Sequence, residues 1–356
     1  MRTIVSKFGG SSTADADCFK QVLSIVRQNP ARQCIVLSAP GINAIHREKV
    51  TALLEKCWHL RWKPDRLGCA VAKVVERFTG IAEALSLYDV KAQCEREIMN
   101  ALYLSRAHTL SRGEYLCAWL FSEYSGLKLL DASGLIAFDG ALQLDERRTL
   151  DRLGTINNSE GAVVLPGFYG SDPSGHIVLF PSNGSDITGA LAAAGMEAGL
   201  YENWSDVPGL MTADPAIVPD ARLIPQVSYR QMRQLSRAGA RILHPACLDP
   251  VAMAGIPTRL RCTRSPESFG TLIDEKYDRI APCMAGVKTT VLPEATKEEQ
   301  RCARISLFGL RLADILRASQ SLTPLLINAL RDQTDVYVKT EDYEASMRLL
   351  HHRLLE

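Results

Sequence analysis

The sequence predicts an α/β fold with a mainly parallel central sheet, followed by a small α+β module near the C-terminus. Short apolar runs alternate with longer segments whose apolar residues recur every three or four positions, which is typical of a parallel sheet covered by helices. After residue 273 a shorter strand and helix order begins. A length of 356 residues suits about two domains. We expect residues 1–275 to form the first and residues 276–356 the second.

The first elements are predicted as a strand, a helix, a second strand and a long helical region. Residues 2–8 alternate in polarity and meet a Gly-Gly-Ser-Ser turn. The helix that follows has Ser12 and Asp15 at the spacing of a capping box. The second strand, at residues 34–38, ends at a Pro-Gly pair, and residues 48–125 are predicted to be mostly helical.

Strands return further along the chain, each next to a turn rich in proline or glycine. They are expected at residues 129–130, 162–165, 177–180 and 199–201, with helices at residues 188–194 and 228–235. In the C-terminal module the predicted order is strands at 284–292 and 305–308, a helix at 313–321, a strand at 336–339 and a helix at 343–355.

Composition excludes several classes of partner. Lys and Arg number 41 and Asp and Glu number 40, so the net charge of +1 gives no footprint for nucleic acid or an anionic membrane. No apolar run approaches the ~18 residues of a membrane helix, and the polar start lacks a signal peptide's apolar segment. The ten cysteines form no Cys-x-x-Cys pair and no zinc-site spacing with histidine. We expect a cytoplasmic protein with reduced thiols, no protein-held metal and small-molecule partners.

The first chemical motif is KFGGSS at residues 7–12, where the first strand ends. Adjacent glycines let backbone N–H groups approach a phosphate closely, and the helix that follows favours an anion at its N-terminus. Lys7 would add a mobile positive charge beside Gly9, Gly10 and Ser11. The order differs from the Walker pattern because the lysine precedes the glycines. Alone, the motif also fits a tight strand-to-helix turn with a surface lysine.

Two further motifs place an acid near a predicted helix start. SRGEYL at residues 111–116 contains Glu114, which could pair with a substrate ammonium or only complement the helix dipole. NGSDITG at residues 183–189 repeats the glycine-and-hydroxyl pattern. There Asp186 could orient a substrate amine or metal-bound water, or lie in the first turn of an ordinary helix.

A fourth motif joins two acids in loops near a strand end. WSDVPG at residues 204–209 contains Asp206, and TADP at residues 212–215 contains Asp214. Such acids suit ribose hydroxyls or a magnesium-linked network. The alternative is a pair of turn-forming aspartates.

In order and spacing these segments resemble an aspartate kinase of the amino acid kinase family. The similarity runs from the N-terminus to about residue 273. No single motif is specific, but the ordered set is. The segments that add to the four motifs are residues 38–41, 49–51, 166–170, 201–203, 239–244 and 270–273.

The resemblance implies an amino-acid-kinase-like sandwich that uses ATP and Mg²⁺ to phosphorylate the side-chain carboxylate of L-aspartate, giving an acyl phosphate. It assigns catalysis to Lys7 and Asp186. The residues that would face the nucleotide are Lys7, Gly9, Gly10, Ser11, Ser205, Asp206, Asp214 and Arg241. Those that would hold the amino acid are Thr51, Glu114, Ser182 and Ser185.

The sequence departs from the family pattern at two arginine positions. Ser182 occupies the place of the arginine that clamps the substrate's α-carboxylate, and a hydroxyl cannot replace a bidentate guanidinium. Ala216 replaces a phosphate-side arginine, for which Arg241 would partly compensate. Two alternatives therefore stay open: a catalytically impaired paralogue that binds nucleotide or amino acid, and a kinase for a modified acidic amino acid. A kinase for glutamate, carbamate or uridylate fits the motifs less well.

The C-terminal module is shorter than the paired ACT modules of relatives. Residues 284–292 resemble a remnant of the first module and residues 303–356 a reduced second one. We expect a homodimer with weak or absent inhibition by lysine or threonine. His244, which precedes a proline, is expected to be a structural histidine because an ionised carboxylate needs no general base.

Overall fold

The computed structural model describes residues 2–156, 161–181, 183–240, 243, 245–293 and 301–355. The chain divides into two compact units. The first unit contains residues 1–207 and 246–268, and the second contains residues 208–245 and 269–356. The chain therefore passes from one unit to the other three times. The domain boundary expected near residue 275 stays a prediction.

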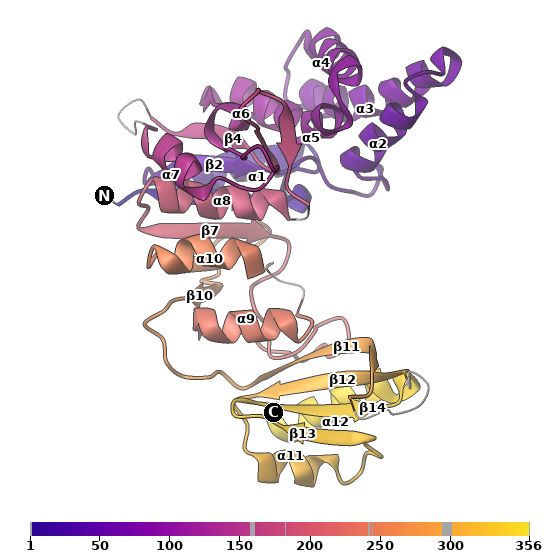
Figure 1. Cartoon of the computed structure of the whole chain (residues 1–356), viewed down its shortest axis with the longest axis vertical. Coiled ribbons are helices and arrows are strands. Elements are labelled where there is room, and N and C mark those ends of the chain that lie inside the picture. Colours follow the sequence, from indigo (N-terminus) through magenta and orange to yellow (C-terminus); the bar gives the residue numbers. More distant parts are fainter. Residues whose placement is uncertain are drawn as a thin grey trace. The chain divides into compact units, whose positions relative to one another are not determined.

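A parallel sheet forms the centre of the first unit (Figure 1), as the sequence predicts. Each neighbouring pair among its strands is parallel. Their order is β3 (Lys128–Leu129), β4 (Val163–Pro166), β2 (Arg32–Leu37), β1 (Ile4–Phe8), β7 (Leu200–Ser205) and β9 (Thr258–Cys262). A small antiparallel pair, β5 (Tyr169–Ser171) and β6 (Ile177–Leu179), forms a separate sheet.

Helices cover this sheet, and a group of long helices gathers beyond one part of it (Figure 1). The group consists of α2 (Val50–Leu60), α3 (Pro64–Ala84), α4 (Val90–Leu104) and α5 (Arg106–Ser125). The other helices of the unit are α1 (Ala16–Gln28), α6 (Ala132–Leu135), α7 (Glu146–Gly154), α8 (Gly184–Gly195) and α10 (Pro245–Met253). The long helical region and the alternation of strands and helices are confirmed.

The two faces of β1 and β7 meet different helices because side chains alternate along a strand. Phe8 and Trp204 stack and join the apolar core that also buries Phe19 of α1. On the opposite face α8 packs closely, and a Cβ atom added to Gly189 would lie 2.7 Å from the Tyr201 hydroxyl oxygen. The small residues of α8 thus allow a helix to approach the sheet backbone.

Helix α1 begins differently from the prediction. Residues Gly10–Ser12 form a 3₁₀ turn, and Asp15 is the N-cap whose carboxylate accepts a hydrogen bond from the Cys18 amide at 2.9 Å. The capping box predicted for Ser12 and Asp15 is therefore wrong. The acid itself satisfies the first turn, and the serine belongs to the turn before it.

The second unit contains an antiparallel sheet in the order β11 (Cys283–Val291), β12 (Arg301–Phe308), β14 (Gln333–Val338) and β13 (Leu326–Ala329). Helices α11 (Leu312–Ser319) and α12 (Tyr343–Leu355) share one apolar core with it. Short strands β8 (Gln226–Val227) and β10 (Thr271–Ile273) pair in parallel, and α9 (Tyr229–Arg237) follows β8. The small α+β module is confirmed, but the sequence did not predict β13.

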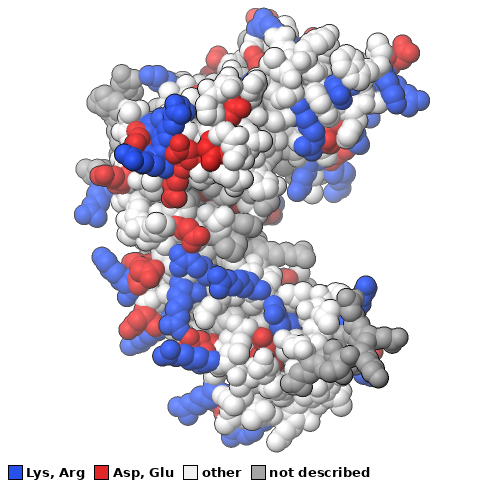
Figure 2. Space-filling model, in the orientation of Figure 1, with Lys and Arg blue, Asp and Glu red and all other residues white. Residues whose placement is uncertain are grey.

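Lys and Arg are interspersed with Asp and Glu over the face of the molecule shown in Figure 2, consistent with the net charge of +1. Within the described ranges no helix is both long and apolar enough to cross a membrane.

Candidate active site

The carboxyl ends of the parallel strands in the first unit open onto a cavity of about 1240 Å³. Ligands of open α/β sheets bind at this edge, where loops from neighbouring strands converge. Its wall includes five predicted site residues, Gly10, Ser11, Thr51, Glu114 and Asp206. It also includes two cationic residues that the sequence did not single out, Arg47 and Arg264, together with Lys49 of the segment 49–51.

Lys7 is held in place by an acid that the sequence also singled out. Its Nζ lies 2.6 Å from Asp186 Oδ1, and the two side chains are 9% and 14% exposed. Parallel pairing places Lys7 beside Asn203 on β7, and the Asn203 amide donates to the same carboxylate oxygen at 2.7 Å. The two residues assigned to catalysis therefore form one ion pair. The side-chain amide of Asn203, which the motifs did not predict, orients its carboxylate.

The glycine turn after β1 offers two free backbone donors. The amides of Gly10 and Ser11 donate to no group in the described part of the chain. The Gly9 amide, by contrast, donates to the Trp204 carbonyl at 3.0 Å. A phosphate would therefore meet the N–H groups of Gly10 and Ser11. A role for the Gly9 amide as a phosphate donor, implied by the resemblance, does not fit this geometry.

Gly10 and Gly41 form a close contact between the ends of β1 and β2. The Gly41 amide donates to the Gly10 carbonyl at 2.8 Å. A Cβ atom on Gly41 would lie 2.6 Å from that carbonyl's carbon and oxygen, and one on Gly10 would lie 2.9 Å from the Ala39 oxygen. Because all these neighbours are backbone atoms, no side chain can move aside, and glycine is required at both positions.

Glu114 lies well inside α5 rather than at its start, because the helix begins at Arg106. The prediction that Glu114 lies at a helix start is therefore wrong. The alternative that this acid only complements the helix dipole is wrong as well. The side chain lines the cavity, the residue is 5% exposed, and Oε2 has no hydrogen-bond partner among the described residues. Burial raises the pKa of Glu114 to about 8, opposed in part by the Ala39 amide and the Lys7 charge.

Other predicted residues take supporting places in the first unit. Thr51 lies in the first turn of α2, and Ser185 is buried in the first turn of α8. Ser205 ends β7, and its hydroxyl accepts a hydrogen bond from the Val207 amide at 3.3 Å. Asp206 is exposed in the cavity wall.

The cavity wall does not include five other predicted residues of the first unit, which are Lys7, Gly9, Ser185, Asp186 and Ser205. Asp214 belongs to the second unit, where its carboxylate accepts a hydrogen bond from the Ala216 amide at 2.9 Å in an exposed turn. Ser182 and Arg241 lie outside the described residues, as does His244.

Asp186 and Asp206 are the carboxylates of the candidate site that could contact a divalent cation. Within the described residues, no group of three or more His, Cys, Asp or Glu side chains is placed to hold a metal. Mg²⁺ commonly keeps several waters and binds through one or two carboxylates together with substrate phosphates. Asp186 and Asp206 are separate acids that fit this mode.

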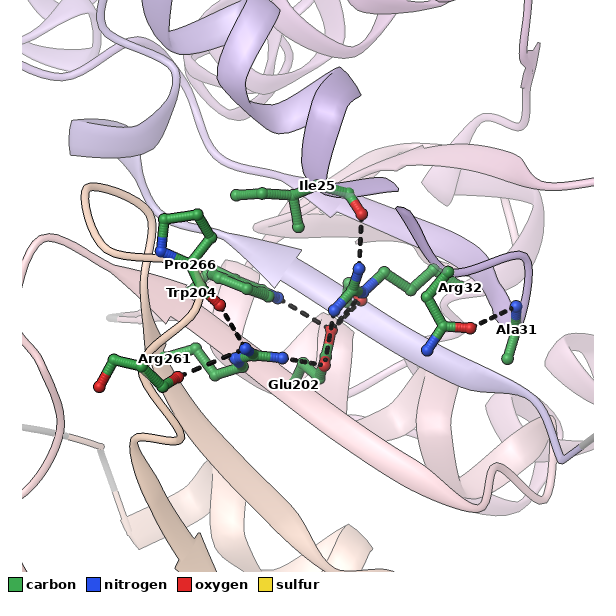
Figure 3. A network of polar contacts seen from close by, with 10 residues as sticks. Ile25, Ala31, Arg32, Glu202, Trp204, Arg261 and Pro266 are labelled. Atoms are coloured by element: carbon green, nitrogen blue, oxygen red, sulfur yellow. Dashed lines mark hydrogen bonds and ion pairs between the residues drawn. The ribbon is translucent and has the colours of Figure 1, made fainter. Parts of the chain in front are cut away.

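A buried ionic network lies on the other face of the sheet, centred on Glu202 of β7 (Figure 3). Its carboxylate accepts hydrogen bonds from Arg32 Nε at 2.7 Å, Arg261 Nη1 at 3.2 Å, the Trp204 indole at 3.0 Å and Ser6 Oγ at 2.9 Å. Burial opposes ionisation, but the bonds and charge of Arg32 outweigh it, so the pKa of Glu202 is lowered. The network joins β1, β2, β7 and β9 directly behind the Trp204 carbonyl that receives the Gly9 amide.

A sequence signal existed for one of the missed residues. Tyr201, Asn203 and Ser205 alternate with Glu202 and Trp204 along β7, so strand periodicity places Asn203 on the face that carries Lys7. Arg77, which lies in the interior of α3 and contacts the Gly41 carbonyl, had no such signal. Its partner is distant in sequence and is a backbone atom.

Comparison with known proteins gives a consistent set of relatives. The sequence profile of the amino acid kinase family matches residues 2–262. Aspartokinase 3 of Bacillus subtilis (strain 168) is 31% identical over 301 residues, covering 80% of this chain and 66% of that protein. Lysine-sensitive aspartokinase 3 of Escherichia coli is 30% identical over 301 residues, covering 77% of this chain and 65% of that protein. The chain thus spans slightly less than two thirds of the length of these relatives.

Solved structures share the whole described architecture. Clostridium acetobutylicum aspartate kinase superposes with a TM-score of 0.88 at 25% identity, covering 98% of this chain and 99% of that chain. E. coli aspartokinase III in complex with aspartate and ADP gives a TM-score of 0.82 at 21% identity, covering 99% of this chain and 100% of that chain. The second comparison supports the fold only.

Proposed function

The chain belongs to the amino acid kinase family, and from that premise we propose that it transfers the terminal phosphoryl group of ATP to the side-chain carboxylate of L-aspartate. One observation carries the proposal. A single cavity has two free amides, of Gly10 and Ser11, in one part of its wall and the buried acid Glu114 with Thr51 in another. Amide donors suit a phosphate, and a buried acid suits an ammonium group.

The reaction asks little of the protein at the nucleophile. An aspartate side chain has a pKa near 3.9 in water and is ionised at neutral pH, so no general base is needed. The rate gain comes from aligning the two substrates and neutralising charge on the transferring group. This requirement matches a site with a fixed lysine and rigid glycine turns rather than a proton-relay site.

Each residue then has a defined task. Lys7, oriented by Asp186, supplies positive charge to the transferring phosphoryl group. Ionised Glu114 binds the substrate ammonium, and Thr51 offers a hydroxyl to the same ligand. Ser205 and Asp206 face the nucleotide.

We propose that Mg²⁺ accompanies the nucleotide, with Asp186 or Asp206 as its protein ligand. When bound, the ion would neutralise charge on the phosphate oxygens.

The relatives support this assignment over the alternatives. The two curated relatives described above are named aspartokinases. The ion pair of Lys7 with Asp186 and the position of Glu114 favour an active enzyme over an impaired paralogue. Arg47 and Lys49 in the cavity wall provide cationic groups for an α-carboxylate that Ser182 cannot clamp.

The second unit is proposed to serve in homodimer formation through an ACT-like module. The four-stranded antiparallel sheet and the helices α11 and α12 that share its core fit that assignment. Weak inhibition by lysine or threonine stays a prediction.

The test is phosphotransfer by the purified chain. With MgATP and L-aspartate, we expect ADP release together with an acyl phosphate that hydroxylamine traps as the hydroxamate. Lys7→Met should lower kcat by roughly a hundredfold or more, because it removes charge stabilisation of the transition state. Lys20→Met is the matched control, because Lys20 is exposed on α1 and its ion pair in the described structure is with the exposed Asp17.

A panel of acidic amino acids, including aspartate with its α-carboxylate amidated, identifies the acceptor. Turnover of the amide but not of aspartate would replace L-aspartate by a modified acid. ADP release without hydroxamate for any acceptor would refute the proposal.

A further inference from the structure

Arg77 is a buried cation with few partners. It lies on α3, is 2% exposed, and its Nη2 donates to the Gly41 carbonyl. Its Nε and Nη1 have no hydrogen-bond partner within the described part of the chain. A buried charge with unsatisfied donors costs folding free energy, and apolar residues of similar size are often at least as stable there. Fold stability therefore does not explain this guanidinium.

Among the described residues, Arg77 has a charge interaction with Asp15 and a hydrogen bond to the backbone of Gly41, which lies against the glycine turn of the candidate site. The carbonyl of Gly41 accepts from Arg77, while the amide of Gly41 donates to the Gly10 carbonyl at 2.8 Å. Glycine rotates more freely about its backbone bonds than any other residue. An anchor on the carbonyl side therefore limits how the Gly41 amide can turn relative to the phosphate-binding turn.

The loop after Gly41 carries the other side of the cavity. Asn43 Nδ2 donates to the Ala14 carbonyl at 3.2 Å, just before the N-cap of α1. The chain then continues through Arg47 and Lys49 to Thr51, all in the cavity wall. Holding Gly41 thus fixes the start of a segment that joins the phosphate side to the amino-acid side.

We propose that Arg77 is a positioning residue that acts through Gly41 to fix the distance between the phosphate-binding turn and the loop that leads to Thr51. The inference rests on the proposed function and extends it to a residue outside the cavity wall. It does not contact substrate. Its contribution is the alignment of two loops, and a misplacement of about 1 Å can cost on the order of a hundredfold in rate.

The test compares three variants of the full-length chain. Arg77→Met keeps the side-chain bulk but removes every donor, Arg77→Lys keeps one charged donor group, and Val71→Ala removes buried apolar volume from the same helix. For Arg77→Met we expect an unchanged or higher melting temperature with kcat/KM for ATP lowered about tenfold or more. Arg77→Lys should recover part of the loss. Val71→Ala should lower the melting temperature and leave KM for ATP unchanged.

A second measurement does not depend on turnover. Amide hydrogen exchange over residues 38–50 should be faster in Arg77→Met than in wild type and unchanged in Val71→Ala. If the wild type transfers no phosphoryl group, the proposed function fails while the exchange comparison still decides the role of Arg77. The inference is overturned if Arg77→Met matches Val71→Ala in both stability and exchange, or if exchange over residues 38–50 does not change.

Discussion

Glu114 is a buried acid with one carboxylate oxygen available to bind a ligand. Its carboxylate lies at the cavity wall, one oxygen has no partner in the described structure, and burial raises its pKa to about 8. Near neutral pH much of this acid is protonated in the free protein. A bound ammonium would favour the ionised form.

Aspartate binding is therefore expected to depend on pH. As pH rises from about 6.5 to 8.5, the ionised fraction of Glu114 increases and KM for aspartate should fall. Glu114→Gln should raise KM about tenfold to a hundredfold, since a charge-assisted contact is worth about 1.5–3 kcal/mol, and should remove this pH dependence. Steady-state kinetics across this range provide the measurement. Glu55→Gln, which alters an exposed pair with Arg106, is the control and should keep the wild-type profile.

Gly41 allows a matched comparison of two glycines. In Gly41→Ala the new methyl group would meet the Gly10 backbone at 2.6 Å, so we expect a stability loss of about 1–3 kcal/mol and activity reduced at least as far as in Arg77→Met. Gly68 lies inside α3 with nothing within 4 Å of an added Cβ, so Gly68→Ala should stabilise by about 1 kcal/mol. Denaturant midpoints and turnover would test both. Equal effects at the two positions would contradict the close contact of Gly10 and Gly41.

At the scale of elements, Glu202 links four strands that are distant in sequence. Arg32 and Arg261 reach it from β2 and β9, and Trp204 reaches it along β7 (Figure 3). Ser6 reaches it from β1. Two arginines around one buried acid leave excess positive charge if the acid is neutralised. The strand ends that carry Lys7 and the glycine turn depend on this network for their alignment.

Removing the Glu202 charge should destabilise the first unit strongly. We expect Glu202→Gln to lower the free energy of unfolding by about 3–5 kcal/mol, because the arginines stay buried without their counter-charge. Since the folded-state pKa of Glu202 is lowered, its stabilisation is complete above the unfolded pKa near 4.3 and is lost as pH falls through the folded value. The difference between wild type and variant should therefore be full at pH 7 and shrink below about pH 4. Glu344→Gln, at an exposed pair with Lys288, should change stability by less than about 1 kcal/mol.

The sequence predicted elements better than contacts. Periodicity located β1, α1, the long helices and α12, because each buries a regular apolar stripe. It missed β13, whose residues Leu326–Ala329 are half-buried or exposed and alternate weakly. It placed a helix start at Ser111, whereas the helix begins at Arg106. No proline or glycine marks that beginning in the sequence.

For the candidate site, five residues predicted from motifs lie in the cavity wall, but the motifs did not predict its fine geometry. Lys7, Asp186 and Glu114 were predicted because charged groups beside glycines suggest ligand chemistry. The roles of Asn203 and Arg77 depend on pairing across strands and on a backbone carbonyl, which no local pattern encodes. The hydrogen bond of the Gly9 amide likewise depends on the carbonyl of Trp204, which is distant in sequence.

At the scale of the whole molecule, the second unit is assembled from two separate stretches of chain. Ala213 and Val218 share the apolar core of β12, β14, α11 and α12. Thr212 accepts a backbone hydrogen bond from Met284 at 2.8 Å and bonds His351 through its hydroxyl at 2.9 Å. Residues 212–222 therefore depend on residues beyond 280 for their burial.

These two stretches should open as one cooperative unit. In native-state hydrogen exchange at increasing denaturant, we expect residues 212–222 to lose protection together with residues 301–308 and 333–338, because they share one core. Residues 4–8 and 200–205, in the first unit, should open independently of this transition. Loss of protection at 212–222 together with β1 and β7 instead would contradict the shared core.

The two units alternate along the chain, and this limits where the chain can be truncated or fused to another protein. A gene fusion or expression fragment ending near residue 275 would keep residues 208–245 while discarding the strands that cover Ala213 and Val218. The fragment would expose an apolar surface and would tend to aggregate. A donor module grafted there would have to complete a partly formed core, so exchange of C-terminal modules by simple end-to-end recombination is disfavoured in this architecture.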